Sequence, residues 1–475
     1  MSMPAAKRQR LSGSKKALIK RDLLTLPQEI VFLVFSFLGA ADLTTCARVS
    51  TKWYAAASDE QLWKPLFLYR FPNPRQMLVQ QLRSQKLHGK QSVGPNRHGR
   101  QDKWKTLYKV NHNWETGNCK VEELQLPIHT TRLNSRQQHL PEEAKATDSF
   151  LFQVCNDIIV TASTDSANID IWQIEESIIR HIATAPPSVE TVAYVTCIKW
   201  DNTDHTRVVA GYSNGGFTVY QFDAKKRSIM ELAGHAARPS VDCDRHSVQS
   251  IALCEKMVMT CSSDMELSTY LCEDQGTRLC HSLISAMTWE PLTLEIFAKS
   301  NNSYQAIVCF GMSAGLDSWT LGIQEVIFTP TVILSSRHSS SRTHRYGSND
   351  PIRKISYAHP YVVTSHNNNT MQHYRICSEQ GQRVEIEHVR TLWGHTSSVG
   401  AMALDARIGR LVSGDRAGIK VWNLESHNDL VVGIENGLCE NMDWIGFDSE
   451  KIVTVAGDHE NNVKVWSFSN SSGDK

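Results

Sequence analysis

The sequence has no CxxC pair, no long apolar run and almost no net charge. Its 12 cysteines are irregularly spaced, whereas disulfide scaffolds and zinc sites use clustered cysteines. We therefore expect reduced thiols and a protein of the nucleus and/or cytoplasm. The apolar run at 30–38 is far shorter than the roughly 20 residues that span a bilayer. A net charge of +1 gives no reason to expect nucleic acid or a membrane as partner.

Recognisable catalytic motifs are also missing. The sequence contains no Walker-type phosphate loop, no HExxH and no tightly spaced set of metal ligands. We therefore expect no catalytic residues, no cofactor and no metal. A metal-dependent or hydrolytic enzyme is the third hypothesis, after the two binding functions described below.

A repeated pattern occupies the sequence from residue 158 to residue 466. Each copy has an apolar stretch, a short Gly/Asn/Asp/Ser turn and an alternating stretch that closes on Trp or Tyr, which is typical of a β-hairpin. The copies span 158–172, 207–220, 257–270, 306–319, 361–374, 411–422 and 451–466. Their closing aromatics recur every 44 to 55 residues, close to the spacing of four-stranded propeller blades. The pattern predicts an all-β seven-bladed propeller.

The copy that begins at Gly394 resembles a WD repeat. The resemblance implies a buried structural relay in which a His, a turn Asp and a strand Ser are hydrogen-bonded toward the Trp. The candidates are His395, Ser413, Asp415 and Trp422. The copy that begins with Gly234 implies a second relay of His235, Thr260 and Asp264. A buried His and Asp need such partners, so we interpret these residues as structural.

The end of the sequence is too short to complete a seventh blade. After Trp466 only nine residues remain, so the last blade would lack its outer strand and expose an edge. The segment 119–126 lies before the first blade and alternates suitably. We predict that it supplies the missing strand and closes the ring.

Residues 22–70 have a helical period instead. Apolar residues at Ile30, Leu33, Val34, Phe37 and Leu38 form a stripe. Pro27 stands where helices begin, and Asp42 and Asp59 are suitable caps for two further helices. About three short helices result, too few for a robust core. One interpretation is a helical subdomain that packs on the propeller.

The same residues resemble an F-box, through LPxE at 26–29, FL at 37–38, DL at 42–43, VSxxW at 49–53 and LW at 62–63. The resemblance implies docking onto a Skp-type adaptor and through it to a cullin-based ubiquitin ligase. Exposed apolar surface would suit such a partner. The residues expected to bind the adaptor are Leu26, Pro27, Ile30, Leu33, Phe37, Leu38, Leu43, Val49, Trp53, Leu62 and Trp63.

The expected domains follow from these patterns. They are a basic disordered tail at 1–21, the small all-α F-box at 22–70, a partly helical linker at 71–117 and the all-β propeller at 118–470. Within the linker, 103–119 regains a helical pattern. The tail contains seven Lys/Arg between Lys7 and Arg21, in two clusters that are typical of a bipartite nuclear import signal, or else of a solvated tail.

Basic residues gather where a propeller would bind a partner. The turns inside hairpins and the connections between blades open on one face of a propeller, and two expected connections are long and basic. The candidates for a substrate face are Arg238, Arg245, Arg337, Arg342, Arg345, Arg353 and Arg416. Arginine suits carboxylate or phosphate, so we hypothesise an acidic or phosphorylated protein substrate. The alternative is that these Ser/Arg-rich loops are solvated or are themselves phosphorylated.

Two binding functions therefore compete. In the first, which the F-box resemblance implies, the protein is the substrate receptor of a Skp–cullin–F-box ubiquitin ligase without covalent chemistry of its own. In the second, it is a WD-repeat scaffold in another complex. Binding to a Skp-type adaptor distinguishes them.

Overall fold

The fold was examined in a computed structural model. It describes residues 27–71, 103–126, 150–155, 157–163, 168–175, 178–185, 193–201, 206–223, 226–236, 246–273, 276–285, 290–299, 302–315, 318–341, 350–377, 384–425, 432–434, 442–456 and 462–469. These residues form two compact units, a helical unit that extends as far as Lys109 and a β-sheet unit from Val110 onward.

Short helices make up the first unit. Their bounds are α1 (Gln28–Phe35), α2 (Ala40–Ala47), α3 (Thr51–Ala57), α4 (Glu60–Arg70) and α6 (Lys103–Thr116), of which α6 continues into the second unit. None of these described helices is long and apolar enough to cross a membrane. The helix predicted within 103–119 is confirmed as α6.

Four helices form before residue 72, where the sequence predicted three. Ser50 begins the additional helix α3, because its side chain accepts a hydrogen bond from the backbone N–H three residues later at 3.3 Å. Asp59 caps α4, as predicted. The prediction for Asp42 was wrong, since Gly39 occupies the N-cap of α2 and Asp42 lies in its first turn.

The helical unit has its own small core. The buried members are Val31, Phe35, Leu43, Ala57, Leu62 and Trp63. The Trp63 indole N–H donates to the carbonyl of Ala57 at 2.8 Å, so even the polar atom of this ring is satisfied inside the core.

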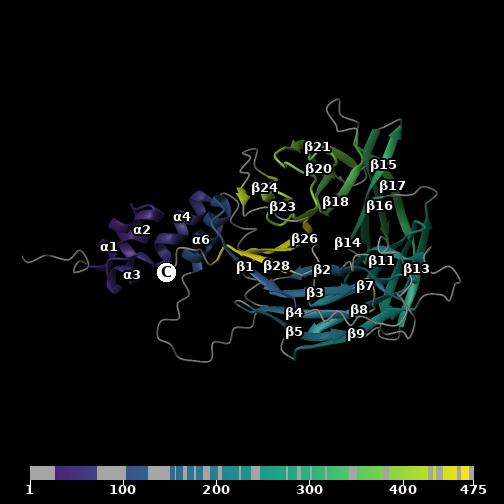
Figure 1. The fold of residues 1–475 in the computed structure, drawn as a ribbon, viewed down its shortest axis with the longest axis horizontal. Coiled ribbons are helices and arrows are strands. Elements are labelled where there is room, and N and C mark those ends of the chain that lie inside the picture. The colour runs from purple at the N-terminus through teal and green to yellow at the C-terminus, as the bar shows by residue number, and fades with distance from the viewer. Residues whose placement is uncertain are drawn as a thin grey trace, which may run out of the picture. The chain divides into compact units, whose positions relative to one another are not determined.

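Seven four-stranded antiparallel sheets, or blades, form the second unit (Figure 1). Blade 1 is β2 (Phe150–Cys155), β3 (Ile158–Ser163), β4 (Ile169–Glu175) and β5 (Ile178–Ala185). Blade 2 is β6 (Val195–Trp200), β7 (Arg207–Tyr212), β8 (Phe217–Asp223) and β9 (Ser228–His235). Blade 3 is β10 (Val248–Cys254), β11 (Met257–Ser262), β12 (Glu266–Glu273) and β13 (Gly276–Ile284). Blade 4 is β14 (Leu292–Ala298), β15 (Tyr304–Gly315), β16 (Ser318–Phe328) and β17 (Ile333–Ser340).

The remaining blades complete the ring. Blade 5 is β18 (Ile352–Ala358), β19 (Tyr361–His366), β20 (Met371–Cys377) and β21 (Glu385–Leu392). Blade 6 is β22 (Ala401–Asp405), β23 (Arg410–Asp415), β24 (Gly418–Asn423) and β25 (Val432–Ile434). Blade 7 is β26 (Met442–Phe447), β27 (Lys451–Ala456), β28 (Asn462–Ser467) and β1 (Lys120–Gln125).

The predicted closure of the ring is confirmed. Strand β1 pairs antiparallel with β28, with Val121 opposite Trp466 and Leu124 opposite Val463, and the two strands lie side by side in Figure 1. The outer edge of β28 is thereby paired. Together with the seven sheets, this pairing establishes the predicted seven-bladed propeller.

A separate apolar cluster lies between each pair of neighbouring blades. Blades 1 and 2 share one that includes Val160 and Trp200, and blades 7 and 1 share one that includes Val463 and Trp172. The five other neighbouring pairs have corresponding clusters. A single hairpin cannot bury its apolar face, and the ring does so by sandwiching every sheet between two others.

One repeat was aligned wrongly. In six blades the closing aromatic pairs opposite the second residue of the preceding strand, as Trp172 does with Ile159 and Trp422 with Leu411. Trp319 instead pairs opposite Ser313, beside the turn. The physical reason is that β15 and β16 contain 12 and 11 residues, whereas the corresponding strands of the other blades contain six to eight.

Candidate binding surfaces

Helix α1 is apolar around its whole circumference. Val31 and Phe35 face the core of the helical unit. Ile30, Leu33 and Val34 are 44%, 57% and 41% exposed. A helix that is apolar all round is normally buried on every side, so α1 has one face that the described residues leave uncovered.

The uncovered face continues past the end of α1. Phe37 is 82% exposed and follows Ile30, Leu33 and Val34 at helical spacing. Val49, between α2 and α3, is 64% exposed. We call Ile30, Leu33, Val34 and Phe37 the α1 face. Exposed apolar patches of this kind mark protein interfaces.

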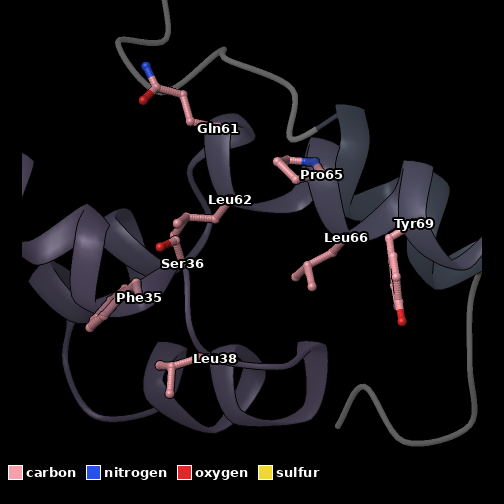
Figure 2. Close-up of a pocket in the computed structure, with 8 residues that line it drawn as sticks. All are labelled: Phe35, Ser36, Leu38, Gln61, Leu62, Pro65, Leu66 and Tyr69. Atoms are coloured by element: carbon pink, nitrogen blue, oxygen red, sulfur yellow. The ribbon is translucent and has the colours of Figure 1, made fainter.

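A pocket of about 200 Å³ lies between the end of α1 and α4 (Figure 2). Its lining residues are Phe35, Ser36, Leu38, Gln61, Leu62, Pro65, Leu66 and Tyr69. Ser36 and Leu38 flank Phe37 in sequence, which places the exposed Phe37 next to the pocket. The pocket is largely apolar and can accept a side chain of a partner.

Several residues predicted to bind an adaptor lie in the core of the helical unit. Leu43, Leu62 and Trp63 are 0%, 5% and 2% exposed, Leu62 lines the pocket, and their direct contact with an adaptor stays a prediction. Leu38 and Trp53 are half-buried, and the Trp53 ring centroid lies 5.5 Å from that of Phe35. The stripe predicted from periodicity nevertheless contains the exposed residues of the α1 face, whereas the intervening Val31 and Phe35 are buried.

Five other predicted adaptor residues are exposed, namely Pro27, Ile30, Leu33, Phe37 and Val49. Leu26 lies outside the described residues. Most of these exposed residues therefore lie on α1 or directly at its ends.

The relay residues of blade 6 meet in the structure. Trp422 donates its indole N–H to Ser413 Oγ at 2.8 Å, and Ser413 Oγ lies 2.7 Å from His395 Nε2. His395 Nδ1 lies 3.1 Å from Asp415 Oδ2. The side chains of His395 and Asp415 are almost fully buried, so the chain of contacts gives polar neighbours to groups whose burial would otherwise be costly.

Asp415 also organises the turns around it. Its Oδ2 accepts the N–H groups of Thr396 and Ser397 at 3.0 and 3.2 Å, and its Oδ1 accepts those of Ala417 and Gly418 at 3.0 Å each. Burial alone would raise the pKa of Asp415, but His395 and these backbone donors together hold the pKa below its usual value. Asp415 is therefore ionised at neutral pH.

The pKa of the relay histidine is lowered, whereas the pKa of a histidine in a surface ion pair is raised by its partner. Burial lowers the pKa of His395 below its ordinary value, against the attraction of Asp415. At neutral pH we therefore assign a neutral imidazole that is protonated at Nδ1 and accepts the Ser413 hydroxyl at Nε2. With its partners inside blade 6, we interpret this imidazole as a structural group.

The second predicted relay is different. His246 Nδ1, and not an atom of His235, lies 3.0 Å from Asp264 Oδ2. His235 is the last residue of β9, and its ring packs 4.8 Å from Tyr270. A long connection separates β9 from β10, which moves His235 out of the position that His395 has in blade 6 and brings in His246. Thr260 lies buried in β11.

The hydrogen bond from a closing Trp indole to a strand hydroxyl recurs in two blades for which the sequence predicted no relay. Trp172 donates to Thr161 Oγ1 at 2.8 Å in blade 1, and Trp466 donates to Thr454 Oγ1 at 3.4 Å in blade 7. Each hydroxyl is on the fourth residue of its strand, as Ser413 is in β23. The closing Trp follows this hydroxyl by 11, 12 and 9 residues in blades 1, 7 and 6, so no fixed sequence spacing relates the three contacts.

Of the seven predicted basic residues, the structure describes Arg337, Arg353 and Arg416, and Arg337 lies apart from the other two. It is in β17, the outer strand of blade 4, opposite Glu325, because the segment 333–340 continues the sheet and is no connection. Arg353 is the second residue of the inner strand β18, and Arg416 lies in the β23–β24 turn. Arg238, Arg245, Arg342 and Arg345 lie outside the described residues.

No obvious reactive centre stands out in the described part of the chain. Within it, no group of three or more His, Cys, Asp or Glu side chains is placed to hold a metal ion. The cysteines there are free thiols, and burial raises the pKa of Cys155, Cys197 and Cys261 to about 12. These thiols stay protonated at neutral pH and are poor nucleophiles.

A short helical unit with an uncovered apolar face, followed by a closed seven-bladed propeller, defines the class of F-box proteins with a propeller. Comparison with family models agrees. Residues 23–69 match the F-box-like family, and residues 136–436 match the family described as F-box protein pof12 beta-propeller. The second match covers more than half of the chain, and the chain belongs to this family.

Individual relatives are more distant. A protein of Arthroderma benhamiae named probable E3 ubiquitin ligase complex SCF subunit sconB is 30% identical over 186 residues, which are 35% of this chain and 25% of that protein. F-box/LRR-repeat protein 5 of Danio rerio is 33% identical over 60 residues, 13% of this chain and 9% of that protein. The chain thus matches a quarter or less of the length of these curated relatives.

Among solved structures, the crystal structure of the computationally designed Ika8 protein is 15% identical. It covers 68% of this chain and 97% of its own, with a TM-score of 0.42. That likeness is too weak to bear on the fold.

Proposed function

We propose that the protein is the substrate-recognition subunit of a Skp–cullin–F-box ubiquitin ligase. The single observation that carries the proposal is the α1 face, an apolar surface on a helical unit that matches the F-box-like family. The name of the sconB relative, a probable SCF subunit, supports it. In this role the helical unit binds a Skp-type adaptor, and through the adaptor a cullin.

The propeller then binds the protein to be ubiquitylated. We propose that its substrate is acidic or phosphorylated, since Arg353 and Arg416 are exposed at the end of the ring where turns and connections lie. The receptor has no covalent chemistry in this scheme. It raises the local concentration of the substrate next to the ubiquitin-carrying enzyme, which is an effective-concentration mechanism.

Burial of the α1 face supplies the binding free energy. A fully buried Phe or Leu side chain contributes about 1.5–3 kcal/mol relative to an exposed one. The four side chains of the α1 face therefore contribute about 6–12 kcal/mol, which is comparable to the free energy lost with rotational and translational freedom. The pocket beside Phe37 offers room for an anchoring side chain from the adaptor.

The test is co-purification of the tagged full chain with the Skp-type adaptor and the cullin of the same organism. We expect both to be recovered with the parent chain and neither with Ile30→Asp/Phe37→Asp. Arg337→Glu, on a propeller strand, is the control and should recover both. A parent chain that recovers neither partner would favour the alternative, a WD-repeat scaffold of a different complex.

We further propose that the protein works in the nucleus and/or cytoplasm. The basic segment 7–21 lies outside the described residues, and its composition supports import. Fluorescence of a tagged chain should move from the nucleus to the cytoplasm when the Lys and Arg residues of this segment are replaced by Gln. An unchanged distribution would identify the segment as a solvated tail.

A further inference from the structure

The connection between blades 5 and 6 crosses the end of the propeller, from the outer strand β21 to the inner strand β22. On one side, Asn369 in the β19–β20 turn donates its amide to the Thr396 carbonyl at 3.2 Å. On the other side, the backbone N–H of Arg416 in the β23–β24 turn donates to Ser397 Oγ at 3.1 Å. Two turns and one connection are thus joined into a continuous surface, which we call the blade 5–6 surface.

An exposed indole begins this connection. Trp393, directly after β21, is 69% exposed. The closing tryptophans of the blades, Trp172, Trp422 and Trp466, are at most 4% exposed. Tryptophan is highly buried on average and is enriched at the energetic centres of protein interfaces. Trp393 therefore has the properties of a docking residue.

The position of Trp393 is fixed by its neighbours. Leu392, the preceding residue, is buried in the cluster between blades 5 and 6. The carbonyl of Gly394, the following residue, accepts a hydrogen bond from Lys420 Nζ. With both neighbours held, the indole is presented from an ordered backbone, which reduces the conformational entropy lost on binding.

Cationic side chains flank the same connection. Arg353, at the start of β18, donates its Nε–H to the side chain of Asn367 in the neighbouring turn, and this contact uses one of the five N–H donors of a guanidinium. Arg416 lies across the connection and is exposed. Lys354 donates to the carbonyl of Gly400, at the end of the connection.

The carboxylates placed near these cations among the described residues are those of Asp415, Asp443 and Asp350. Asp415 is buried and occupied by His395 and four backbone N–H groups. Asp443 is exposed and close enough to Lys354 to raise the pKa of that amine. Asp350 precedes β18 and is half-buried. The excess of positive charge on the exposed side chains therefore favours an anionic partner.

We propose that the blade 5–6 surface binds a carboxylate-rich peptide segment that carries an apolar side chain, with Trp393 contacting the apolar side chain and Arg353 and Arg416 the carboxylates. The proposal rests on the proposed function, because this segment would belong to the substrate of the receptor. It favours Asp and Glu over a phosphate because the cations come from different blades and are spread along the surface. A single phosphate is best held by donors that converge on one point.

The experiment uses the purified full chain and an array of synthetic twelve-residue peptides in four matched sets. The first set has four Glu residues and one Leu or Phe. The second replaces the Glu residues by Gln, the third replaces the Leu or Phe by Ala, and the fourth replaces the Glu residues by Gln and adds one phosphoserine. We expect the first set to contain the strongest binders, with each of the other sets at least tenfold weaker.

Variants then locate the site. Trp393→Ala and Arg416→Glu should each weaken the best peptide at least tenfold. Arg337→Glu is the matched control, since it reverses the same kind of charge on the outer strand β17, and it should leave the affinity within twofold. Thermal unfolding of each variant confirms that the propeller is intact, and Arg353→Glu provides a second charge reversal if one variant unfolds.

Three results would overturn the inference: no binding by any peptide set, strongest binding by the phosphoserine set, or equal binding by the parent chain and both surface variants. The same protein samples are assayed for the Skp-type adaptor. Intact adaptor binding without peptide binding would reject this inference alone. Absence of adaptor binding by the parent chain would reject the proposed function, whatever the peptides do.

Discussion

The helical unit and the propeller differ in how completely they bury their apolar side chains. The propeller places a cluster between every pair of neighbouring blades and shows arginines at the blade 5–6 surface. The helical unit buries one side of α1 and leaves Ile30, Leu33 and Phe37 exposed. A unit that is complete by itself can vary its surface to suit a substrate, whereas an incomplete one needs a fixed partner to cover it.

This comparison separates two kinds of contact. The α1 face should bind through apolar burial, which depends little on ionic strength. The blade 5–6 surface should bind through charge and one indole, which salt weakens. Changes within one unit should also leave the other unit's binding unaffected.

The largest expected effect on the propeller comes from Asp415→Asn. An amide nitrogen cannot accept hydrogen bonds, and either side-chain oxygen of Asp415 accepts from two backbone N–H groups. We expect the free energy of unfolding to fall by about 2–3 kcal/mol, the cost of leaving buried donors without partners. Urea unfolding followed by circular dichroism measures it.

The matched control is Glu123→Gln. The Glu123 carboxylate is more than half exposed and lies 3.5 Å from Lys464 Nζ, and such surface pairs contribute at most about 1 kcal/mol. Adaptor binding should be unchanged in both variants. Equal losses of stability in the two variants would show that the relay does not hold blade 6 together.

A second prediction concerns blade 5, where a histidine replaces an aliphatic residue. His373 is buried and has no hydrogen-bond partner at either nitrogen. It pairs opposite the third residue of β19, where blades 2, 6 and 7 have Val219, Val421 and Val465. We expect His373→Ile to raise the free energy of unfolding by about 1 kcal/mol at pH 7.5, since it removes unpaired buried polar atoms.

The pH dependence sharpens this prediction. Burial, with help from Arg390, His388 and Arg375, lowers the pKa of His373 to about 4 from an ordinary value of 6.5. The unfolded chain therefore binds the proton more tightly, and stability is lost as the pH falls from about 6.5 toward 4. At pH 5 the loss from this one group amounts to about 2 kcal/mol.

His373→Ile should remove that part of the acid loss, so its advantage over the parent chain should grow from pH 7.5 to pH 5. Burial also lowers the pKa values of His359, His366 and His395, so some acid sensitivity remains in the variant. An advantage that stays constant with pH would contradict the assignment of a buried neutral imidazole at position 373.

The smallest expected effect is that of salt on the two binding surfaces. Between 50 and 300 mM NaCl, the dissociation constant of the best carboxylate-rich peptide should rise about fivefold, because exposed charge pairs are screened. That of the Skp-type adaptor should stay within twofold. Fluorescence polarisation at a series of salt concentrations measures both, and a stronger salt dependence for the adaptor would reverse the assignment of chemistry to surfaces.

The sequence was sufficient for the number of blades and the closure of the ring, because aromatic spacing and strand alternation are local patterns. Prediction from the sequence failed where strands or connections differ in length from one blade to the next. The β15–β16 hairpin is about twice as long as its counterparts, which displaced Trp319, and the long connection before β10 exchanged His246 for His235 beside Asp264.

The candidate sites were harder to predict for a different reason. The F-box resemblance assigned Trp63 and Phe37 to the same surface, although Trp63 is buried and Phe37 is 82% exposed. A motif match does not show which side of a helix is covered by tertiary packing. No sequence motif marked Trp393 as exposed, because its exposure results from its position directly after the end of β21.

The most direct test of the central claim is the affinity of the purified full chain for the purified Skp-type adaptor, measured by titration calorimetry. We predict tight binding with a negative heat-capacity change, the mark of apolar burial. Phe37→Asp should weaken it at least about 100-fold, equivalent to about 2.7 kcal/mol, and Arg416→Glu should leave it within twofold. An adaptor that binds Phe37→Asp as tightly as the parent chain would contradict the claim that the α1 face is the adaptor surface.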